Sequence, residues 1–375
     1  MQSRILPTAS LLFASALIIT ACGAGTSADN GSVPIGLISA EQGPFAFAGG
    51  SYLKGAKLAE TLLNEGGNKI KLVVEEGSED PAKSITAFNK LASQHKAAGV
   101  VCCISSAVAG ALKPLATQKE VPLIVYGATA PDVEDPPFVY RPALLPQQGI
   151  KPVATELVKS LQPATAIHVT ASDNDGLVAQ SKAASAATEA AGAKNLGTVN
   201  TLLADTDFSG TVTKILSKKP EMVTVYTLGE QAATIVKSLR EKDYKGIILA
   251  NNAVATGPNL KSFGKALADT YFSVEYTPGS DVEEAVSFTK AYKKEYGETP
   301  DVFASQGFVA VNYVAKGLEL DAAASKTALG ASLEKITEMD TVWGPIKFQN
   351  GQGIAEKFQI VKIDDTGTPK LWTGQ

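Results

Sequence analysis

Hydroxyl side chains follow two of the predicted strands at the points where those strands end. Ser105 and Ser106 come after the apolar run 99–104, and Thr129 follows the next run, 123–126. In an open parallel sheet, ligands bind beyond the carboxyl ends of the strands, where loops lead into helix N-termini. Because those N-termini carry unpaired amides and partial positive charge, hydroxyls placed there suit a carboxylate. The alternative is that Ser105 and Ser106 only cap the helix that follows.

The side chains on which metal sites and nucleophilic catalysis depend are scarce. The chain has two histidines, His95 and His168, and three cysteines, so a His/Cys metal cluster is unavailable. No P-loop, G-x-G-x-x-G loop or G-x-S-x-G elbow occurs. We therefore expect no cofactor, no metal and no catalytic residue. An extracytoplasmic hydrolase, the enzymatic alternative, would have to bring a nucleophile to one of the two histidines at a cleft.

Cys102 and Cys103 lie side by side in the predicted strand 99–104. Neighbouring residues of a strand point to opposite faces, so an ordinary disulfide between them is geometrically poor. We predict that both are small apolar core residues, with a redox role as the alternative.

The composition excludes nucleic acid as a partner and disorder as a state. Of 375 residues, 45% are hydrophobic and 19% are charged, and the net charge is −4. Like charges form no block, whereas phosphate binding needs a clustered basic face. High apolar content with small net charge predicts a folded chain, and the length favours two domains.

The N-terminal residues have the pattern of an export signal. Arg4 precedes an apolar run, 11–19, that is too short to span a bilayer. The run ends in Ile19-Thr20-Ala21-Cys22, which looks like a bacterial lipobox. We expect residues 1–21 to be a lipoprotein signal peptide, Cys22 to carry the lipid, and residues 22–32 to form a flexible tether on the outer face of the cell membrane. The alternative is an ordinary secretory signal with a chance cysteine.

Predicted strands alternate with predicted helices along the rest of the chain. The first round has strands at 33–39, 70–74, 99–104 and 123–126, separated by helices at 51–64, 81–95 and 108–119. The second round has strands at 166–170, 222–226, 246–250 and 271–276, with helices at 148–161, 177–191 and 231–242. Two late helices, 282–296 and 304–320, precede a hairpin-like ending at 344–363. This order predicts an α/β fold of two similar lobes, each a parallel sheet flanked by helices.

Short motifs in a fixed order carry a resemblance to a known family. They are Gln42-Gly43-Pro44, Leu53-Lys54-Gly55-Ala56, Leu63-Asn64-Glu65-Gly66-Gly67, Glu79-Asp80-Pro81, Ser105-Ser106, Val121-Pro122, Ala128-Thr129-Ala130-Pro131, Tyr140-Arg141, Gln148-Gly149 and Trp343-Gly344-Pro345. With a lipobox ahead of them, the chain resembles the leucine/isoleucine/valine-binding group of type 1 periplasmic binding proteins, the solute receptors of ABC importers.

The resemblance implies two interleaved lobes joined by about three hinge crossovers. Lobe 1 would comprise residues 33–142 plus 273–356, and lobe 2 residues 143–272 plus 357–375. The crossings are expected near Arg141–Ala143, Tyr271–Ser273 and Lys357–Phe358. Such lobes rotate together and trap solute between them.

The resemblance also implies binding residues in lobe 1. The positions of Ser105 and Thr129 hold a ligand carboxylate in leucine-binding relatives, and the backbone around Gly127 and Ala128 helps to hold an ammonium. A covering aromatic residue falls on Phe303. A tyrosine near the opening of the relatives' site falls on Ala48, flanked by Phe45 and Phe47, of which we take Phe47 as a candidate contact.

In lobe 2 the chain departs from the relatives. Two tyrosines of their site fall on Asp175 and Leu228, and the acid that pairs the ammonium falls near Asn251-Asn252, of which Asn252 is our candidate. Since a buried ammonium without a carboxylate is costly, either the ligand has no α-ammonium, or Asp175 or Glu230 has taken over. The alternative for 173–176 is a plain turn with an Asx cap.

The expected function is a monomeric solute receptor of an ABC importer. It would capture a small carboxylate-bearing solute, such as a branched-chain or other amino acid, an amide or a related organic acid, and deliver it to a membrane permease. The alternative is a ligand-sensing lipoprotein that presents the solute to a signalling partner.

Overall fold

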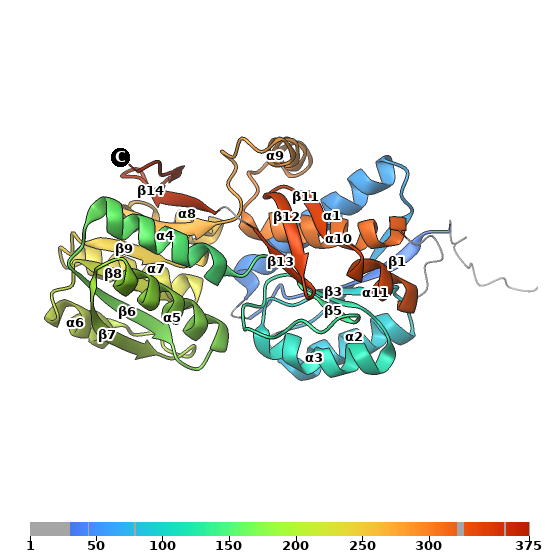
Figure 1. Cartoon of the computed structure of the whole chain (residues 1–375), viewed down its shortest axis with the longest axis horizontal. Coiled ribbons are helices and arrows are strands. Elements are labelled where there is room, and N and C mark those ends of the chain that lie inside the picture. The colour runs from blue at the N-terminus through green and yellow to red at the C-terminus, as the bar shows by residue number, and fades with distance from the viewer. Residues whose placement is uncertain (1–30, 44, 79, 321–325, 356–357, 375) are drawn as a thin grey trace, which may run out of the picture. The chain divides into compact units, whose positions relative to one another are not determined.

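The computed structural model describes residues 31–43, 45–78, 80–320, 326–355 and 358–374, and residues 33–375 cluster as one compact unit (Figure 1). The predicted signal peptide, Cys22 and the tether up to residue 30 lie outside the described residues. None of the helices in the described ranges is long and apolar enough to cross a membrane.

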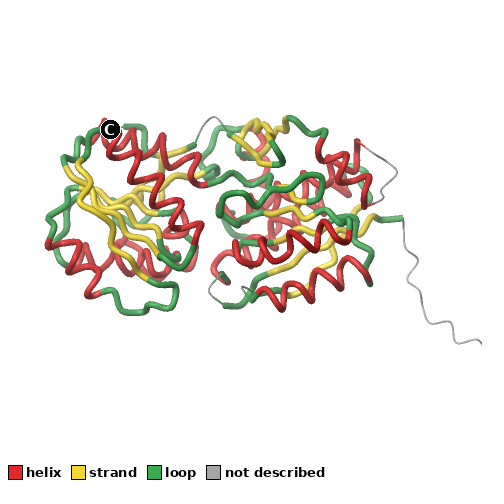
Figure 2. The backbone as a smooth tube through the Cα atoms, turned by 60° about the horizontal axis from the view of Figure 1, so that its bottom comes forward, coloured by secondary structure: helices red, strands yellow, loops and turns green. Residues whose placement is uncertain are grey.

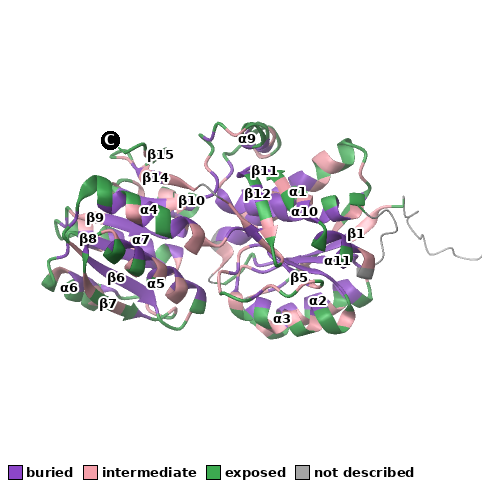
Figure 3. Ribbon diagram, in the orientation of Figure 1, coloured by how far each residue is buried: buried purple, intermediate pink, exposed green. Residues whose placement is uncertain are grey.

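The first sheet is wholly parallel, as the alternation of strands and helices predicts. Its strand order is β2 (Ile70–Glu76), β1 (Val33–Ser39), β3 (Val100–Cys102), β4 (Leu123–Val125) and β5 (Val139–Tyr140). One face is covered by α2 (Pro81–Ser93) and α3 (Ser106–Lys119). The other face is covered by α1 (Ala46–Glu65), α10 (Val302–Leu320) and α11 (Lys326–Glu334). Strands β1, β3, β4 and β5 are therefore buried along all or most of their length, whereas the edge strand β2 is only partly buried (Figure 3).

The second sheet is mixed rather than purely parallel. Its order is β15 (Pro369–Leu371), β14 (Gln359–Ile363), β10 (Thr270–Val274), β9 (Ile247–Ala250), β8 (Met222–Tyr226), β6 (Thr165–Ala171) and β7 (Lys194–Thr201). The strands from β7 to β10 in this order run parallel. At the other edge, β14 pairs antiparallel with β10, and β15 pairs antiparallel with β14. Helices α4 (Pro146–Leu161) and α5 (Asp175–Ala190) cover one face, and α6 (Ser209–Ser217) and α7 (Gly229–Glu241) cover the other (Figure 2).

The chain between the sheets differs in detail from the prediction. The hairpin-like ending at 344–363 is divided: β11 (Glu338–Thr341), β12 (Gly344–Gln349) and β13 (Gln352–Ile354) form a small antiparallel sheet, while β14 joins the second sheet. Strand β10 pairs within the second sheet and spans the expected lobe boundary between residues 272 and 273. The expected third crossing includes Lys357, which lies outside the described residues. Helices α8 (Gly257–Phe263) and α9 (Glu283–Tyr296) complete the fold with two short 3-10 helices, Asn252–Ala255 and Gly264–Leu267.

Close packing of α1 against α10 depends on glycine. A Cβ on Gly307 would overlap the carbonyl oxygen of Tyr52, and one on Gly55 would overlap that of Ala304. Without side chains at these points the two helices approach until their backbones touch. This packing fixes the first turns of α10, which carry Phe303 and Gln306.

Candidate functional site

The two serines at the start of α3 have different surroundings. Ser105 is the N-cap of the helix, and its Oγ accepts a hydrogen bond from the amide of Val108 at 3.4 Å. Ser105 is buried. Its hydroxyl therefore has the capping role that was one of the two interpretations of this position.

Ser106 faces the loop that follows β4. Its Oγ accepts hydrogen bonds from the amides of Thr129, at 3.3 Å, and Ala130, at 3.1 Å. A hydroxyl has two acceptor lone pairs and one donor hydrogen, so these amides use its accepting capacity. The hydrogen of Ser106 is thus free to donate to a ligand, in the first turn of a helix whose dipole favours an anion.

Thr129 lies where the two lobes meet. The Oγ1 of Thr129 accepts a hydrogen bond from Gln180 Nε2 at 3.4 Å, and its carbonyl accepts one from Gln147 Nε2 at 2.9 Å. Gln147 belongs to α4 and Gln180 to α5, both on the second sheet. The N-terminus of α5 comes so close that a Cβ on Gly176 would overlap Thr129 Oγ1. Thr129 is therefore positioned from both lobes.

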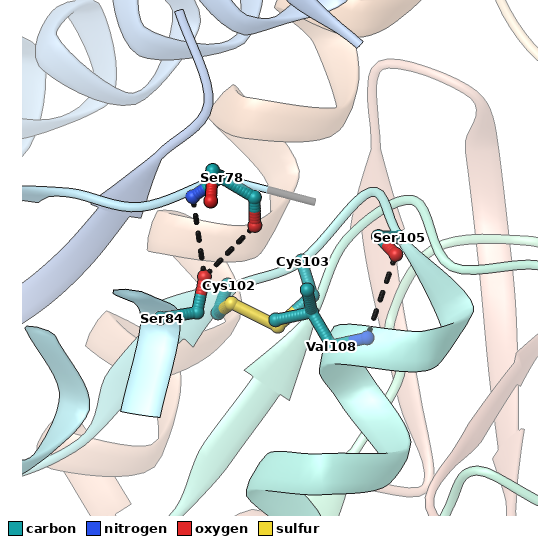
Figure 4. The surroundings of a disulfide bond; sticks show 6 residues. All are labelled: Ser78, Ser84, Cys102, Cys103, Ser105 and Val108. Atoms are coloured by element: carbon teal, nitrogen blue, oxygen red, sulfur yellow. Dashed lines mark hydrogen bonds between the residues drawn. A yellow bond between two sulfur atoms is a disulfide. The ribbon is translucent and has the colours of Figure 1, made fainter. Parts of the chain in front are cut away.

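Cys102 and Cys103 form a disulfide bond just ahead of these serines, which corrects the prediction of two unlinked thiols (Figure 4). Both residues are buried, as predicted. The strand argument fails because β3 ends at Cys102, and Cys103 has a φ of 118°, outside the strand conformation. Its side chain no longer alternates with that of its neighbour. The disulfide lies beside the segment that leads to Ser105 and α3 (Figure 4).

A cavity of about 80 Å³, open to solvent, lies between the carboxyl ends of the two sheets. Its lining residues are Phe45, Ile104, Ser106, Gly127, Thr129, Pro146, Asn174, Leu177, Gln180, Thr227, Leu228, Gly229, Asn251, Asn252, Ala253, Phe303 and Gln306. The lining combines apolar side chains with a few polar ones, as sites for small organic solutes do.

The cavity brings together six of the predicted site residues: Ser106, Gly127, Thr129, Leu228, Asn252 and Phe303. Ser105 and Ala128 lie behind the lining, and Asp175 is an exposed residue in the first turn of α5. The side chain of Phe47 lies outside the described residues, although its backbone is part of α1. The turn before α5 has the Asx cap that was the alternative interpretation, since Asn174 Oδ1 accepts the amide of Leu177 at 3.0 Å.

The cavity lining contains no charged side chain among the described residues. Glu230, the other acid considered as a replacement, is exposed in the first turn of α7. Neither histidine lines the cavity. His168 is buried in β6 beside Thr224, where burial lowers its pKa to about 4, and His95 pairs with Glu75. The cavity can therefore bind through hydrogen bonds and apolar contact, without a histidine base.

Two acceptors that sequence reasoning did not assign lie in the cavity lining, Asn251 and Gln306. Asn251 is 7% exposed and its Nδ2 donates to the carbonyl of Thr227, while its Oδ1 has no partner among the described residues. Gln306 is 8% exposed and donates from Nε2 to Glu275 Oε1 at 2.8 Å, while its Oε1 is likewise unpartnered within the described chain. Burial raises the pKa of Glu275, and the bond from Gln306 opposes this. The resemblance pointed to Asn251 as one of two positions for the relatives' ammonium-pairing acid, although Asn252 was the candidate taken, whereas no sequence signal pointed to Gln306.

Arg141 organises the loop that carries Thr129, and the sequence indicated it only as a crossing point. It is 1% exposed, and its Nη1 donates to the carbonyls of Ala128 and Ala130, both at 2.8 Å. Its Nε donates to Gln352 in β13, and Nη2 forms an ion pair with Glu134. The carbonyl of Ala128, part of the backbone around Gly127 and Ala128 that was expected to help with an ammonium, is thus bonded to Arg141.

Comparisons with known proteins agree with this architecture. A family model described as "Periplasmic binding protein" matches residues 32–368. A curated relative, "Leu/Ile/Val-binding protein homolog 7" of Brucella abortus (strain 2308), is 25% identical over 348 residues, with 84% of this chain and 85% of the relative covered.

Solved structures of binding proteins have the same fold. The branched-chain amino acid transporter substrate binding protein LivJ from Streptococcus pneumoniae, in complex with isoleucine, superposes with a TM-score of 0.81 at 20% identity, covering 91% of this chain and 99% of that one. A solute binding protein of an ABC transporter from R. palustris, in complex with benzoate, has a TM-score of 0.81 at 21% identity, covering 91% and 95%. These likenesses confirm the predicted fold of two parallel-sheet cores flanked by helices.

Proposed function

The chain belongs to the periplasmic binding protein family, and from this premise we propose that it is the solute-binding receptor of an ABC importer. It captures a small carboxylate-bearing solute between its lobes and releases it, chemically unchanged, to a membrane permease. One observation carries the proposal: Ser106, in the first turn of α3, and Thr129, in the loop after β4, line the same cavity with their hydroxyl-bearing side chains. Relatives described as Leu/Ile/Val-binding and a structural neighbour that binds benzoate support the same class of solute.

Each residue of the proposed site has one role. Ser106 and Thr129 hold the carboxylate together with the amides of the first turn of α3, while Ser105 maintains the helix cap. Phe303 and Leu228 supply apolar cover, and Gly127 and Asn252 complete the wall. A solute bound at Thr129 touches groups positioned by both lobes, so it favours the conformation in which the lobes are together. We also propose that the two lobes have the boundaries expected from the sequence, except that the whole of β10 belongs to lobe 2.

Replacing Ser106 by alanine should weaken carboxylate binding by about tenfold or more. The variant removes a hydrogen bond to a charged group in a partly desolvated cavity. A thermal-shift screen of amino acids, small amides and aromatic acids would first identify a ligand, and calorimetry would then compare dissociation constants. Ser105→Ala is the matched control, because it removes a neighbouring hydroxyl that caps α3, at about 1 kcal/mol of stability. Hits without carboxylates, or equal affinity losses in the two variants, would contradict the assignment of the anchor.

We propose further that the protein is held on the outer face of the cell membrane by lipid on Cys22. The support is the sequence Ile19-Thr20-Ala21-Cys22 after a short apolar run, together with membership of a family of periplasmic proteins. Cys22→Ser should abolish incorporation of labelled palmitate and move the protein from the membrane fraction to the soluble fraction. Labelling that persists in this variant would refute the proposal, and Cys102→Ser, which should keep the label, is the control.

A further inference from the structure

We propose that the solute carries a neutral hydrogen-bond donor, a hydroxyl or an amide, in addition to its carboxylate. This inference rests on the proposed function of the same cavity and narrows its substrate class. The carboxylate end is recognised by donors, the hydroxyls of Ser106 and Thr129. The lining also includes Asn251 and Gln306, each with a buried amide oxygen that has no partner among the described residues, and we infer that these acceptors determine the second group.

The orientation of each amide follows from its partner. The Nδ2 of Asn251 donates to the carbonyl of Thr227, so its Oδ1 is turned away from that carbonyl. The Nε2 of Gln306 donates to Glu275 Oε1 at 2.8 Å, so its Oε1 is turned away from the carboxylate. Both residues line the cavity, both are more than nine-tenths buried, and neither oxygen has a partner among the described residues. Buried acceptors are normally paired, and a donor on the solute would pair these two.

The charge balance of the cavity selects a neutral donor over an ammonium. No carboxylate lines the described part of the cavity, and Glu275, which does not line it, accepts a hydrogen bond from the Gln306 amide. An ammonium would lose its hydration and receive only amide oxygens, without an opposing charge. A neutral donor has a much smaller desolvation cost: a hydroxyl can donate its one hydrogen to one of these oxygens, and a primary amide can donate to both. The acid expected at this point in leucine-binding relatives is thus replaced by an amide suited to uncharged donors.

Two sets of matched probes test the inference by calorimetry on the purified protein. The first set is leucine, its α-hydroxy analogue and its deaminated analogue; the second is benzoate, para-hydroxybenzoate and para-(aminomethyl)benzoate. In at least one set the hydroxylated probe should bind about tenfold or more tightly than both other members, because a site built for a donor discriminates against analogues that lack it. In Asn251→Ala or Gln306→Ala, this preference should shrink severalfold. Asn312→Ala is the control and should keep the preference, because Asn312 lies in the same helix as Gln306 but does not line the cavity.

The comparison between probes separates a lost acceptor from a damaged fold. A damaged cavity weakens all three probes alike, whereas loss of the acceptor removes only the advantage of the hydroxyl. Equal or tighter binding of the ammonium probes or the unsubstituted acids would overturn the inference and leave the proposed carboxylate receptor intact. If no carboxylate in either set binds, the proposed solute class fails and this inference fails with it.

Discussion

Replacing Arg141 by alanine is expected to destabilise the protein by about 3–5 kcal/mol, because a buried ion pair would lose one partner. Glu134 would be left as a largely buried carboxylate, and the carbonyls of Ala128 and Ala130 would lose their donor. These carbonyls flank Thr129, so solute affinity should fall together with stability. Denaturant unfolding and calorimetry measure the two effects.

Lys113→Ala is the matched control for this prediction. Lys113 donates to the carbonyls of Asp132 and Glu134 in the same loop, but from a half-buried side chain. Its loss should cost less than about 1 kcal/mol, since a charged group that stays partly in contact with water contributes little. Arg141→Lys should remain destabilised, because an ammonium cannot reproduce the planar fork of guanidinium donors. Equal unfolding free energies for Arg141→Ala and Lys113→Ala would contradict the role of Arg141.

Replacing Gly176 by alanine is expected to weaken solute binding by about tenfold or more. The added Cβ would overlap Thr129 Oγ1 and would come to 3.3 Å from the amide of Ala130. Either α5 moves away from the Thr129 loop or the threonine leaves its rotamer, and overpacking of this kind costs about 1–3 kcal/mol. Both responses disturb an anchor that the two lobes share.

Gly210→Ala is the control for Gly176→Ala. Gly210 is the second residue of α6, as Gly176 is of α5, and a Cβ there would meet no atom within 4 Å. Both substitutions gain the same helix propensity, about 1 kcal/mol, so only the contact with Thr129 differs. Affinity should be unchanged in Gly210→Ala. Wild-type affinity in Gly176→Ala would show that the close approach of α5 is not needed for binding.

The fold was predictable because its strands are buried on both faces. Runs such as Val33–Ser39 and Met222–Tyr226 are mostly apolar and are buried along all or most of their length, and amphipathic helices separate such runs. Elements that lack this signal were missed. Strand β7 is an edge strand with several exposed residues and an interior Gly197, and α6 has only nine residues. The antiparallel edge formed by β14 and β15 was also missed, because strand direction depends on where the last crossing enters the sheet.

The sequence by itself determined the family, the α/β order and the hydroxyls at the ends of β3 and β4, because buried strands and strand-to-helix loops leave local patterns. Only the tertiary structure decided what those residues do. It showed that Ser105 caps α3 whereas Ser106 lines the cavity and bonds the Thr129 loop. It also showed that Cys102 and Cys103 are joined and that Arg141 donates to the carbonyls on either side of Thr129. It also brought Asn251 and Gln306, 55 residues apart in the chain, to one cavity, where their amide oxygens have no partner in the described part of the chain. Hydrogen-bond partners distant in sequence have no local pattern, so the second group of the solute could be inferred only after the lobes were in place.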